Sequence, residues 1–254
     1  MAIRSPAFLD PALSLFHPVV QEWFSEEVGV PTDVQRRAWP EIASGKHVLV
    51  TAPTGTGKTL TAFLWALDRF FTGALETGAT RVLYVSPLKA LNTDVRRNLE
   101  EPLAGLSERF RAAGLPVPGV RALVRSGDTP ADERRKMVRR PPEILITTPE
   151  SLNILLTSQG GRAILGAIET VILDEIHAVA GTKRGTHLIT AVERLVPLSG
   201  EFQRIALSAT VRPLSTVADF VGGLQAVPPA APGTRPGEPW RYRKRPVTTV
   251  RSEA

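Results

Sequence analysis

The sequence contains no cysteine and only four histidines among its 254 residues. The absence of cysteine excludes a disulfide framework and any zinc or iron–sulfur site with thiolate ligands. The metal that we expect is therefore Mg²⁺, which prefers oxygen ligands. Long apolar runs are also missing: none approaches the roughly 20 residues that a membrane span needs, and the N-terminus lacks the basic and then apolar pattern of a signal peptide. These absences predict a cytoplasmic protein without membrane contact.

Acidic residues are scarce at one end of the chain. The formal net charge is +6, and residues 228–254 supply +4 of it through five Arg and one Lys against two Glu. The remaining chain is nearly balanced, so the total charge is weak evidence for a nucleic-acid partner, and that evidence has to come from local sites. From residue 226 onward six prolines and two glycines interrupt the chain, which predicts an extended or disordered tail.

A phosphate loop is indicated by residues 52–59. An apolar run at residues 48–51 leads into Ala-Pro-Thr-Gly-Thr-Gly-Lys-Thr, and a helical pattern follows at residues 60–71. Glycines let successive backbone N–H groups point inward, and the helix N-terminus adds positive dipole where polyphosphate oxygens would lie. We expect Lys58 to contact the β and γ phosphates of ATP and the Thr59 hydroxyl to hold Mg²⁺. The cofactor-binding candidates of the loop are Thr54, Gly55, Thr56, Gly57, Lys58 and Thr59.

The phosphate-loop pattern departs from the usual one at its first position, where Ala52 replaces glycine. The alternative interpretation is a glycine-rich turn with a lysine at a helix end. The flanking strand and helix favour the phosphate loop, because the motif requires both.

Two adjacent carboxylates, Asp174 and Glu175, follow the apolar run at residues 170–173. A Mg-nucleotide site needs one carboxylate to orient the metal or its water and another to take the proton from the attacking water. Side chains of neighbouring residues point to different sides, so the two can hold these different roles. Acidic pairs are common on protein surfaces, but the phosphate loop favours a catalytic pair here.

Six apolar runs predict buried strands at residues 48–51, 81–85, 120–124, 143–147, 170–173 and 204–207. Helical patterns alternate with them, which predicts an α/β fold with a parallel sheet and function at the carboxyl ends of the strands. We expect a loosely structured lead over residues 1–18, an α/β lobe over residues 19–225 and the Pro/Arg-rich tail over residues 226–254.

Two further features have two interpretations each. Gln35 lies before the phosphate-loop strand; its amide could recognise the N6 and N7 edge of adenine, or it could be a solvated helix residue. Residues 132–140 contain five basic side chains. They could form a patch that contacts phosphates, or they could be an ordinary solvated helix face. They are Arg134, Arg135, Lys136, Arg139 and Arg140.

In chain order these clusters resemble the first motor lobe of superfamily 2 helicases, a RecA-like P-loop NTPase fold. The matching segments are Gln35, the phosphate loop, Pro-Leu-Lys-Ala-Leu at residues 87–91, Thr-Pro-Glu at 148–150, Asp-Glu-Ile-His at 174–177 and Ser-Ala-Thr at 208–210. The resemblance covers about residues 15–225. Within the superfamily, residues 174–185 resemble the Lhr family, the large helicase-related proteins of bacteria and archaea.

The resemblance implies ATP-driven movement along single-stranded DNA or RNA, typically three-prime to five-prime, in a DNA repair setting. It implies that Lys58, Thr59 and Asp174 handle phosphate and Mg²⁺ and that Glu175 activates water. It also implies that His177, Ser208 and Thr210 couple hydrolysis to strand grip. The residues that would touch the strand backbone are Lys89, Asn92, Ser126, Gly127, Thr147 and Thr148.

A helicase motor closes ATP between two lobes, and the second lobe supplies arginines worth roughly 10³ to 10⁵ in rate. The residues after Thr210 are too few for such a lobe, so we expect this chain alone to bind nucleotide weakly and to hydrolyse it very slowly. One alternative is a nucleic-acid-binding or regulatory module with little ATPase activity. Another is an RNA helicase lobe of the DEAD-box type, which His177 in place of the final Asp disfavours.

Overall fold

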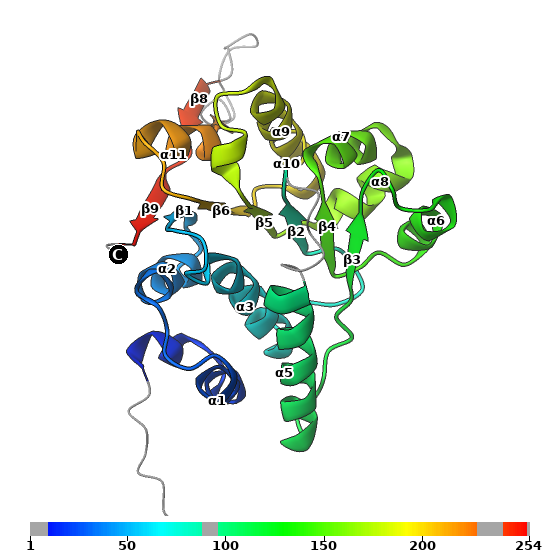
Figure 1. Ribbon diagram of the computed structural model, residues 1–254. Coiled ribbons are helices and arrows are strands. Elements are labelled where there is room, and N and C mark those ends of the chain that lie inside the picture. Colours follow the sequence, from blue (N-terminus) through cyan, green and yellow to red (C-terminus); the bar gives the residue numbers. More distant parts are fainter. Residues whose placement is uncertain (1–9, 88–95, 228–240, 253–254) are drawn as a thin grey trace, which may run out of the picture.

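The computed structural model describes residues 10–87, 96–227 and 241–252, and in them seven strands form one parallel sheet (Figure 1). The strand order is β3-β4-β2-β5-β6-β1-β9. The strands are β1 (His47–Thr51), β2 (Val82–Val85), β3 (Ala122–Arg125), β4 (Ile144–Thr147), β5 (Thr170–Leu173), β6 (Gln203–Ser208) and β9 (Val247–Arg251). A separate antiparallel pair consists of β7 (Leu224–Val227) and β8 (Arg241–Lys244). The predicted α/β fold with a parallel sheet is confirmed.

Helices cover both faces of the sheet (Figure 1). One face carries η1 (Pro11–Leu15), α1 (Pro18–Glu27), α2 (Asp33–Ala43), α3 (Lys58–Phe71), η2 (Arg96–Glu100) and α5 (Glu101–Ala112). The other face and its connections hold α6 (Ala131–Arg139), α7 (Pro149–Thr157), α8 (Gln159–Ile164), η3 (Leu165–Ala167), η4 (Ile176–Ala178), α9 (Lys183–Glu193), α10 (Val196–Ser199) and α11 (Leu214–Gly222). In the described ranges no helix is long and apolar enough to cross a membrane.

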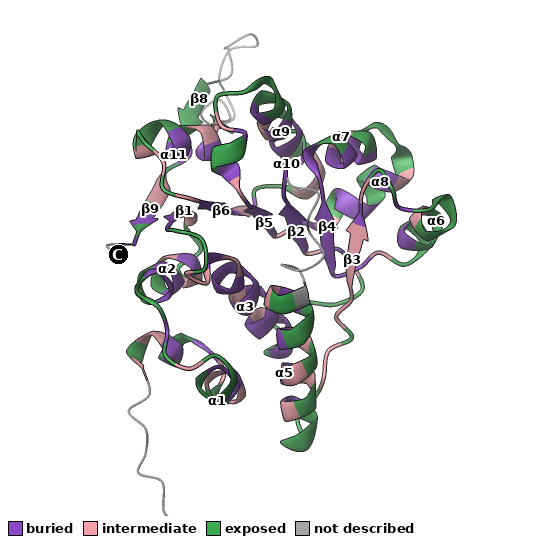
Figure 2. Cartoon of the chain, in the orientation of Figure 1, coloured by how far each residue is buried: buried purple, intermediate pink, exposed green. Residues whose placement is uncertain are grey.

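The central strands are buried on both faces, as Figure 2 shows by their colour. Successive side chains of a strand point to opposite faces, so β1 places Val48 and Val50 in the core beneath α2 and α3 and places Leu49 in the opposite core. The two cores therefore fix the register of the sheet. Because the strands are parallel, their carboxyl ends meet at one edge, where the loops after β1, β5 and β6 lie together.

Residues 10–18 are packed and not a loose lead, so the expectation for this part of the chain is wrong. Leu13 and Phe16 are 1% and 3% exposed. Pro11 and Pro18 occupy the first positions of η1 and α1, where the missing N–H of proline costs nothing.

The expected disorder of residues 226–254 is also wrong for the part that the structure describes. Strand β9 pairs in parallel with β1, from His47 opposite Val247 to Thr51 opposite Arg251. The β-branched run Val-Thr-Thr-Val at residues 247–250 favours a strand, and the prolines and arginines around it concealed this signal in the average composition.

A buried charge cluster attaches this last segment to the lobe. Arg204 of β6 is fully buried and donates from Nη1 to Glu193 Oε1 at 2.8 Å. Arg245, which is 4% exposed, also binds Glu193, at 2.9 Å, and makes two hydrogen bonds to Glu201, at 2.8 and 2.9 Å. Each buried guanidinium therefore has a carboxylate partner, as a buried charge requires.

His47 beside this cluster makes the fold acid-sensitive. Its Nδ1 accepts the backbone N–H of Arg204 at 3.1 Å. Burial, followed by the charges of Arg204 and Arg245, lowers the pKa of His47 below 6.5, against the weaker opposing effect of Glu201 and Glu193. The folded state therefore resists a proton that the unfolded chain takes up, and the contribution to stability that is present above pH 6.5 is lost as the pH falls toward the lowered pKa.

We expect His47→Gln to flatten this pH dependence, because glutamine keeps an acceptor for the Arg204 N–H but does not titrate. Urea unfolding at several pH values between about 7.5 and 5.5 measures the effect. His187→Gln, at an exposed position, is the matched control and should keep the parent slope. An unchanged slope in His47→Gln would show that other groups cause the acid sensitivity.

Candidate active site

The phosphate loop joins β1 to α3, and its shape depends on glycine. Gly55 and Gly57 have φ angles of +85° and +81°, which side-chain-bearing residues rarely adopt. A Cβ atom on Gly57 would also lie 2.7 Å from the Gln35 amide nitrogen. Ala52, by contrast, does not have a positive φ, so alanine fits the position where the usual pattern has glycine.

Lys58 begins α3 and is held inside the loop. Its ammonium donates to the carbonyls of Ala52 and Pro53, both at 2.7 Å, and the residue is 8% exposed. Burial lowers the pKa of Lys58, while the nearby carboxylates of Glu175 and Asp174 act in the opposite direction. The side chain is thus a preorganised cation between the loop and the two acidic residues.

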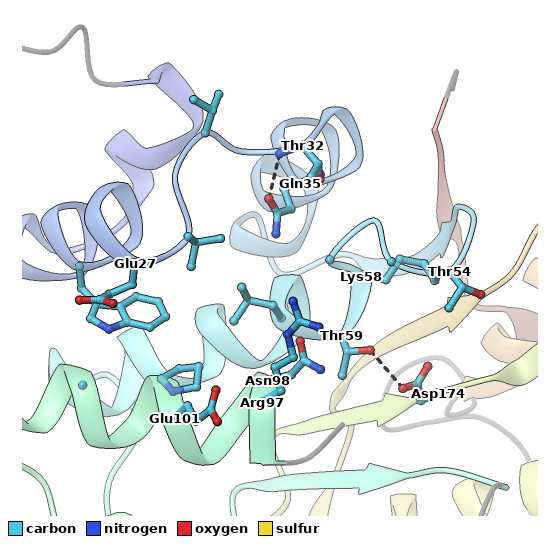
Figure 3. A pocket seen from close by; sticks show the side chains of 18 of the residues that line it. Glu27, Thr32, Gln35, Thr54, Lys58, Thr59, Arg97, Asn98, Glu101 and Asp174 are labelled. Atoms are coloured by element: carbon cyan, nitrogen blue, oxygen red, sulfur yellow. Dashed lines mark hydrogen bonds between the residues drawn. The ribbon is translucent and has the colours of Figure 1, made fainter. Parts of the chain in front are cut away.

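Asp174 follows β5 and faces the first turn of α3 (Figure 3). Its Oδ2 accepts hydrogen bonds from the Tyr84 hydroxyl and, at 3.4 Å, from the Thr59 hydroxyl, while Oδ1 accepts the Glu175 N–H at 2.7 Å. Burial raises the pKa of this carboxyl, and the hydrogen bonds from Tyr84 and from the Glu175 backbone lower it. Two oxygen donors, the Thr59 hydroxyl and the Asp174 carboxylate, therefore lie side by side.

This oxygen pair has the chemistry of a Mg²⁺ site. Mg²⁺ is commonly held by one or two protein oxygens together with waters and substrate phosphates. In the described residues no group of three or more His, Asp or Glu side chains could enclose a metal by itself. The residues therefore fit a cation that a nucleotide brings with it.

Glu175 and His177 connect the acidic pair to the end of β6. Glu175 has a φ of +50°, the one positive value among described residues other than glycine, and its Oε2 lies 3.3 Å from His177 Nε2. His177 Nδ1 accepts the backbone N–H of Ala209 at 3.1 Å. Since Nδ1 is an acceptor, the ring proton is on Nε2 and is donated to Glu175.

A cavity of about 1100 Å³ opens over the phosphate loop. The residues labelled in Figure 3 line it from several elements: the phosphate loop with the start of α3, Asp174 after β5, η2 and α5, the end of α1 and the start of α2. Gln35 is 1% exposed and its Oε1 accepts the Thr32 N–H at 2.9 Å, so it is a buried wall of the cavity and not a solvated helix residue. Its amide nitrogen remains beside Gly57.

Several residues of the site were not identified from the sequence. Tyr84 lies inside the apolar strand β2, which pairs with β5, the strand before Asp174. A hydroxyl-bearing residue in an otherwise apolar strand was the feature of the sequence that could have identified it. Arg97, Asn98 and Glu101 line the cavity from η2 and α5, and no motif marked them.

The nucleic-acid candidates are spread along the same edge of the sheet. Lys89 and Asn92 lie outside the described residues. Ser126 and Gly127 form the surface loop after β3, whereas Thr147 is fully buried and donates to the Arg125 carbonyl at 2.6 Å. Thr148, 8% exposed, caps α7 through Ser151.

The motif at the end of β6 is split between core and surface. Ser208 is fully buried, and its hydroxyl has no hydrogen-bond partner within the described part of the chain. Thr210 is exposed. Their shared neighbour Ala209 is the residue that contacts His177.

Known proteins match this chain over most of its length. The DEAD/DEAH box helicase family model matches residues 32–220. The Lhr helicase/probable uracil glycosylase of Mycolicibacterium smegmatis is 52% identical over 228 residues, which are 87% of this chain and 15% of that protein. The ATP-dependent helicase Lhr-Core of Methanothermobacter thermautotrophicus is 47% identical over 214 residues, or 83% of this chain and 25% of that protein.

A solved structure agrees with these relatives. The Mycobacterium smegmatis helicase Lhr, bound to ssDNA and AMP-PNP, superposes with a TM-score of 0.82 at 46% identity. The match covers 96% of this chain and 28% of that one. The chain therefore spans between 15% and 28% of the length of these three proteins.

Proposed function

The chain belongs to the DEAD/DEAH box helicase family as a motor lobe of the Lhr type, and from this premise we propose that it binds and hydrolyses ATP to drive movement on single-stranded nucleic acid. The observation that carries the proposal is the placement of Lys58, Thr59, Asp174 and Glu175 around one cavity at the carboxyl edge of the sheet. An intact site of this kind disfavours a purely regulatory module.

Each of these residues has a part that follows from its geometry. The Lys58 ammonium exchanges the carbonyls of Ala52 and Pro53 for phosphate oxygens, which offer stronger charge-assisted hydrogen bonds. Backbone N–H groups of the loop surround the remaining phosphate oxygens. Gln35 offers its amide nitrogen to the base, because its amide oxygen is already held by Thr32.

Thr59 and Asp174 would hold Mg²⁺, which when bound offsets the negative charge of the phosphates. Glu175 takes the proton of the attacking water. His177 keeps Glu175 oriented by donating from Nε2, and its Nδ1 accepts the backbone N–H of Ala209. A shift at the end of β6 therefore changes the alignment of the Glu175 carboxylate, and this couples the grip on the nucleic-acid strand to ATP hydrolysis.

The partner of this lobe is single-stranded nucleic acid, and DNA is the first candidate because the similar Mycobacterium smegmatis structure was solved with ssDNA. Full turnover needs the arginines that a second lobe aims at the transferring phosphate, worth roughly 10³ to 10⁵ in rate. We therefore propose that the 254 residues alone turn ATP over slowly.

Steady-state ATP hydrolysis by this chain, with and without single-stranded DNA, tests the proposal. Glu175→Gln is the blank, because it preserves size and hydrogen bonding but removes the base. We expect weak turnover that exceeds the blank and rises when a second lobe is supplied. DNA-stimulated turnover at full speed by the chain alone would contradict the need for a second lobe, and turnover equal in parent and blank with that lobe present would contradict the role of Glu175. Single-stranded RNA in parallel compares the two nucleic acids.

A further inference from the structure

A second, smaller cavity lies at the far edge of the sheet from the phosphate loop. It has a volume of about 100 Å³ and is lined by residues of β3, β4, α6, α7 and α8 and by Ser158. Figure 1 shows these elements together at the β3 edge of the sheet. Two arginines, Arg125 and Arg134, supply its charge, and Ser158 supplies a hydroxyl. Apolar side chains complete the wall: Met137, Val138, Leu145, Leu155 and Ile164.

Arg125 is a buried cation with no anionic partner among the described residues. The residue is 6% exposed, and its side chain makes one hydrogen bond among the described residues, from Nη1 to the Ser126 carbonyl at 2.5 Å. No carboxylate of the described chain pairs with it, and burial together with the charge of Arg134 lowers its pKa. The remaining N–H groups of the guanidinium are not among the enclosed unpartnered atoms of the described residues, so they can donate to a ligand that enters the cavity.

Arg134 adds a second positive charge and holds the loop above the cavity. Its Nε donates to the Thr129 carbonyl at 2.6 Å and its Nη2 donates to the Gly127 carbonyl at 2.7 Å. These neutral acceptors leave the guanidinium charge uncompensated, and no ion pair of Arg134 occurs in the described ranges. The contrast with Arg204 and Arg245 is direct, because those buried guanidinium groups bind Glu193 and Glu201.

We propose that this cavity is a binding site for a phosphate-class oxyanion. Two guanidinium groups that repel each other in a small cavity are stabilised together by one bound anion, and arginine matches tetrahedral oxyanions through paired N–H donors. The volume is several times the 10–15 Å³ that one water needs, so it admits an anion with a few oxygens. This site is distinct from the phosphate loop and does not depend on nucleotide hydrolysis.

The anion can come from two sources. The two arginines that line the cavity also hold the loop after β3, through hydrogen bonds to the carbonyls of Ser126 and Gly127, so a backbone phosphate of a strand bound at this loop is the first source. Free inorganic phosphate, the product that a nucleotide hydrolase releases, is the second.

Thermal unfolding in sodium phosphate against sodium chloride of equal ionic strength tests the site. The test uses Lys58→Ala, so that the phosphate loop contributes little to phosphate binding. We expect phosphate at ten times its Kd to raise the melting temperature by about 3 to 6 °C. Adding Arg125→Gln should abolish the rise, Arg134→Gln should reduce it, and the exposed Arg135→Gln should preserve it.

Binding of single-stranded DNA distinguishes the sources. If the strand supplies the anion, Arg125→Gln lowers the slope of log K against log salt by about one phosphate contact relative to Arg135→Gln. If the slope is unchanged while the phosphate effect is lost, free phosphate is the ligand. A phosphate effect that is absent, or equal in Arg125→Gln and Arg135→Gln, together with equal salt slopes, would overturn the proposal. Arg134→Gln keeps the test decisive should Arg125→Gln fail to fold.

Discussion

Lys58→Ala is expected to weaken ATP binding by roughly 100-fold while leaving the chain folded. The ammonium is one charged donor to phosphate oxygens, and hydrogen bonds to charged groups contribute about 1.5–3 kcal/mol each, which corresponds to about one to two powers of ten in affinity. Loss of the partner that holds the Ala52 and Pro53 carbonyls also relaxes the loop, which adds to the effect. Titration with a fluorescent ATP analogue measures the affinity.

The matched control for this change is Lys46→Ala. Lys46 is exposed and pairs with Glu41 at 2.6 Å on the surface, so its loss should change neither affinity nor stability by more than about 0.5 kcal/mol. Circular dichroism of both variants establishes that they are folded. Equal ATP affinity of Lys58→Ala and the parent would contradict the assignment of residues 52–59 as a phosphate loop.

Deletion of residues 241–254 is expected to unfold much of the lobe. The deletion removes β9 from β1, removes Val250 from the core, and leaves Glu193 and Glu201 without Arg245. Removing one partner of a buried charge pair typically costs about 3–5 kcal/mol, a large share of the roughly 5–15 kcal/mol that stabilises a domain. Urea denaturation of the truncated and full chains measures the difference.

A single substitution gives the same test with less disruption. Arg245→Met should cost about 3 kcal/mol of stability. This is the low end of the range for a buried charge pair, because Glu193 and Glu201 are partly exposed to water. Arg243→Met is the control, since the exposed Arg243 contacts only Gln225 through its charged group in the described residues. Equal stability of the two variants would show that the buried cluster is not what attaches β9.

Part of the positive charge near the C-terminus is used in ion pairs within the lobe. The sequence placed +4 of the net charge of +6 in residues 228–254, within a tail that we expected to be extended or disordered. Arg245 is instead committed to Glu193 and Glu201, and Lys244 pairs with Asp219 at 2.6 Å. A loss of DNA binding after the deletion would therefore reflect the loss of folding as well as the loss of charge.

The phosphate loop and the acidic pair were predictable because their function depends on local backbone shape. Gly55 and Gly57 adopt the φ values that only glycine favours, and Asp174 and Glu175 follow a short apolar strand. Such features are encoded in consecutive residues. The likeness to superfamily 2 motor lobes, and to the Lhr family within it, rested on these motifs and is confirmed.

Contacts between distant segments were not predictable in this way. The pairing of Arg245 with Glu193, the hydrogen bond from Tyr84 to Asp174 and the burial of His47 each join residues far apart in the sequence. Strand β9 was hard to predict for two reasons: its β-branched run is short, and its partner β1 lies about two hundred positions earlier. Of the two arginines of the second cavity, Arg134 appeared only as part of a basic run, in which a buried cation cannot be distinguished from a solvated one, and Arg125 lay outside that run.

The parallel pairing of β9 with β1 also has a mechanical consequence. Ser252, the residue after β9, donates its N–H to the carbonyl of Thr51, the last residue before the phosphate loop, at 3.0 Å. Tension applied to the chain beyond Ser252 along the strand direction would load this ladder in shear, so that its hydrogen bonds share the force and do not open one at a time. Force on the end of β9 is thus transmitted through these hydrogen bonds to Thr51, the residue next to the phosphate loop.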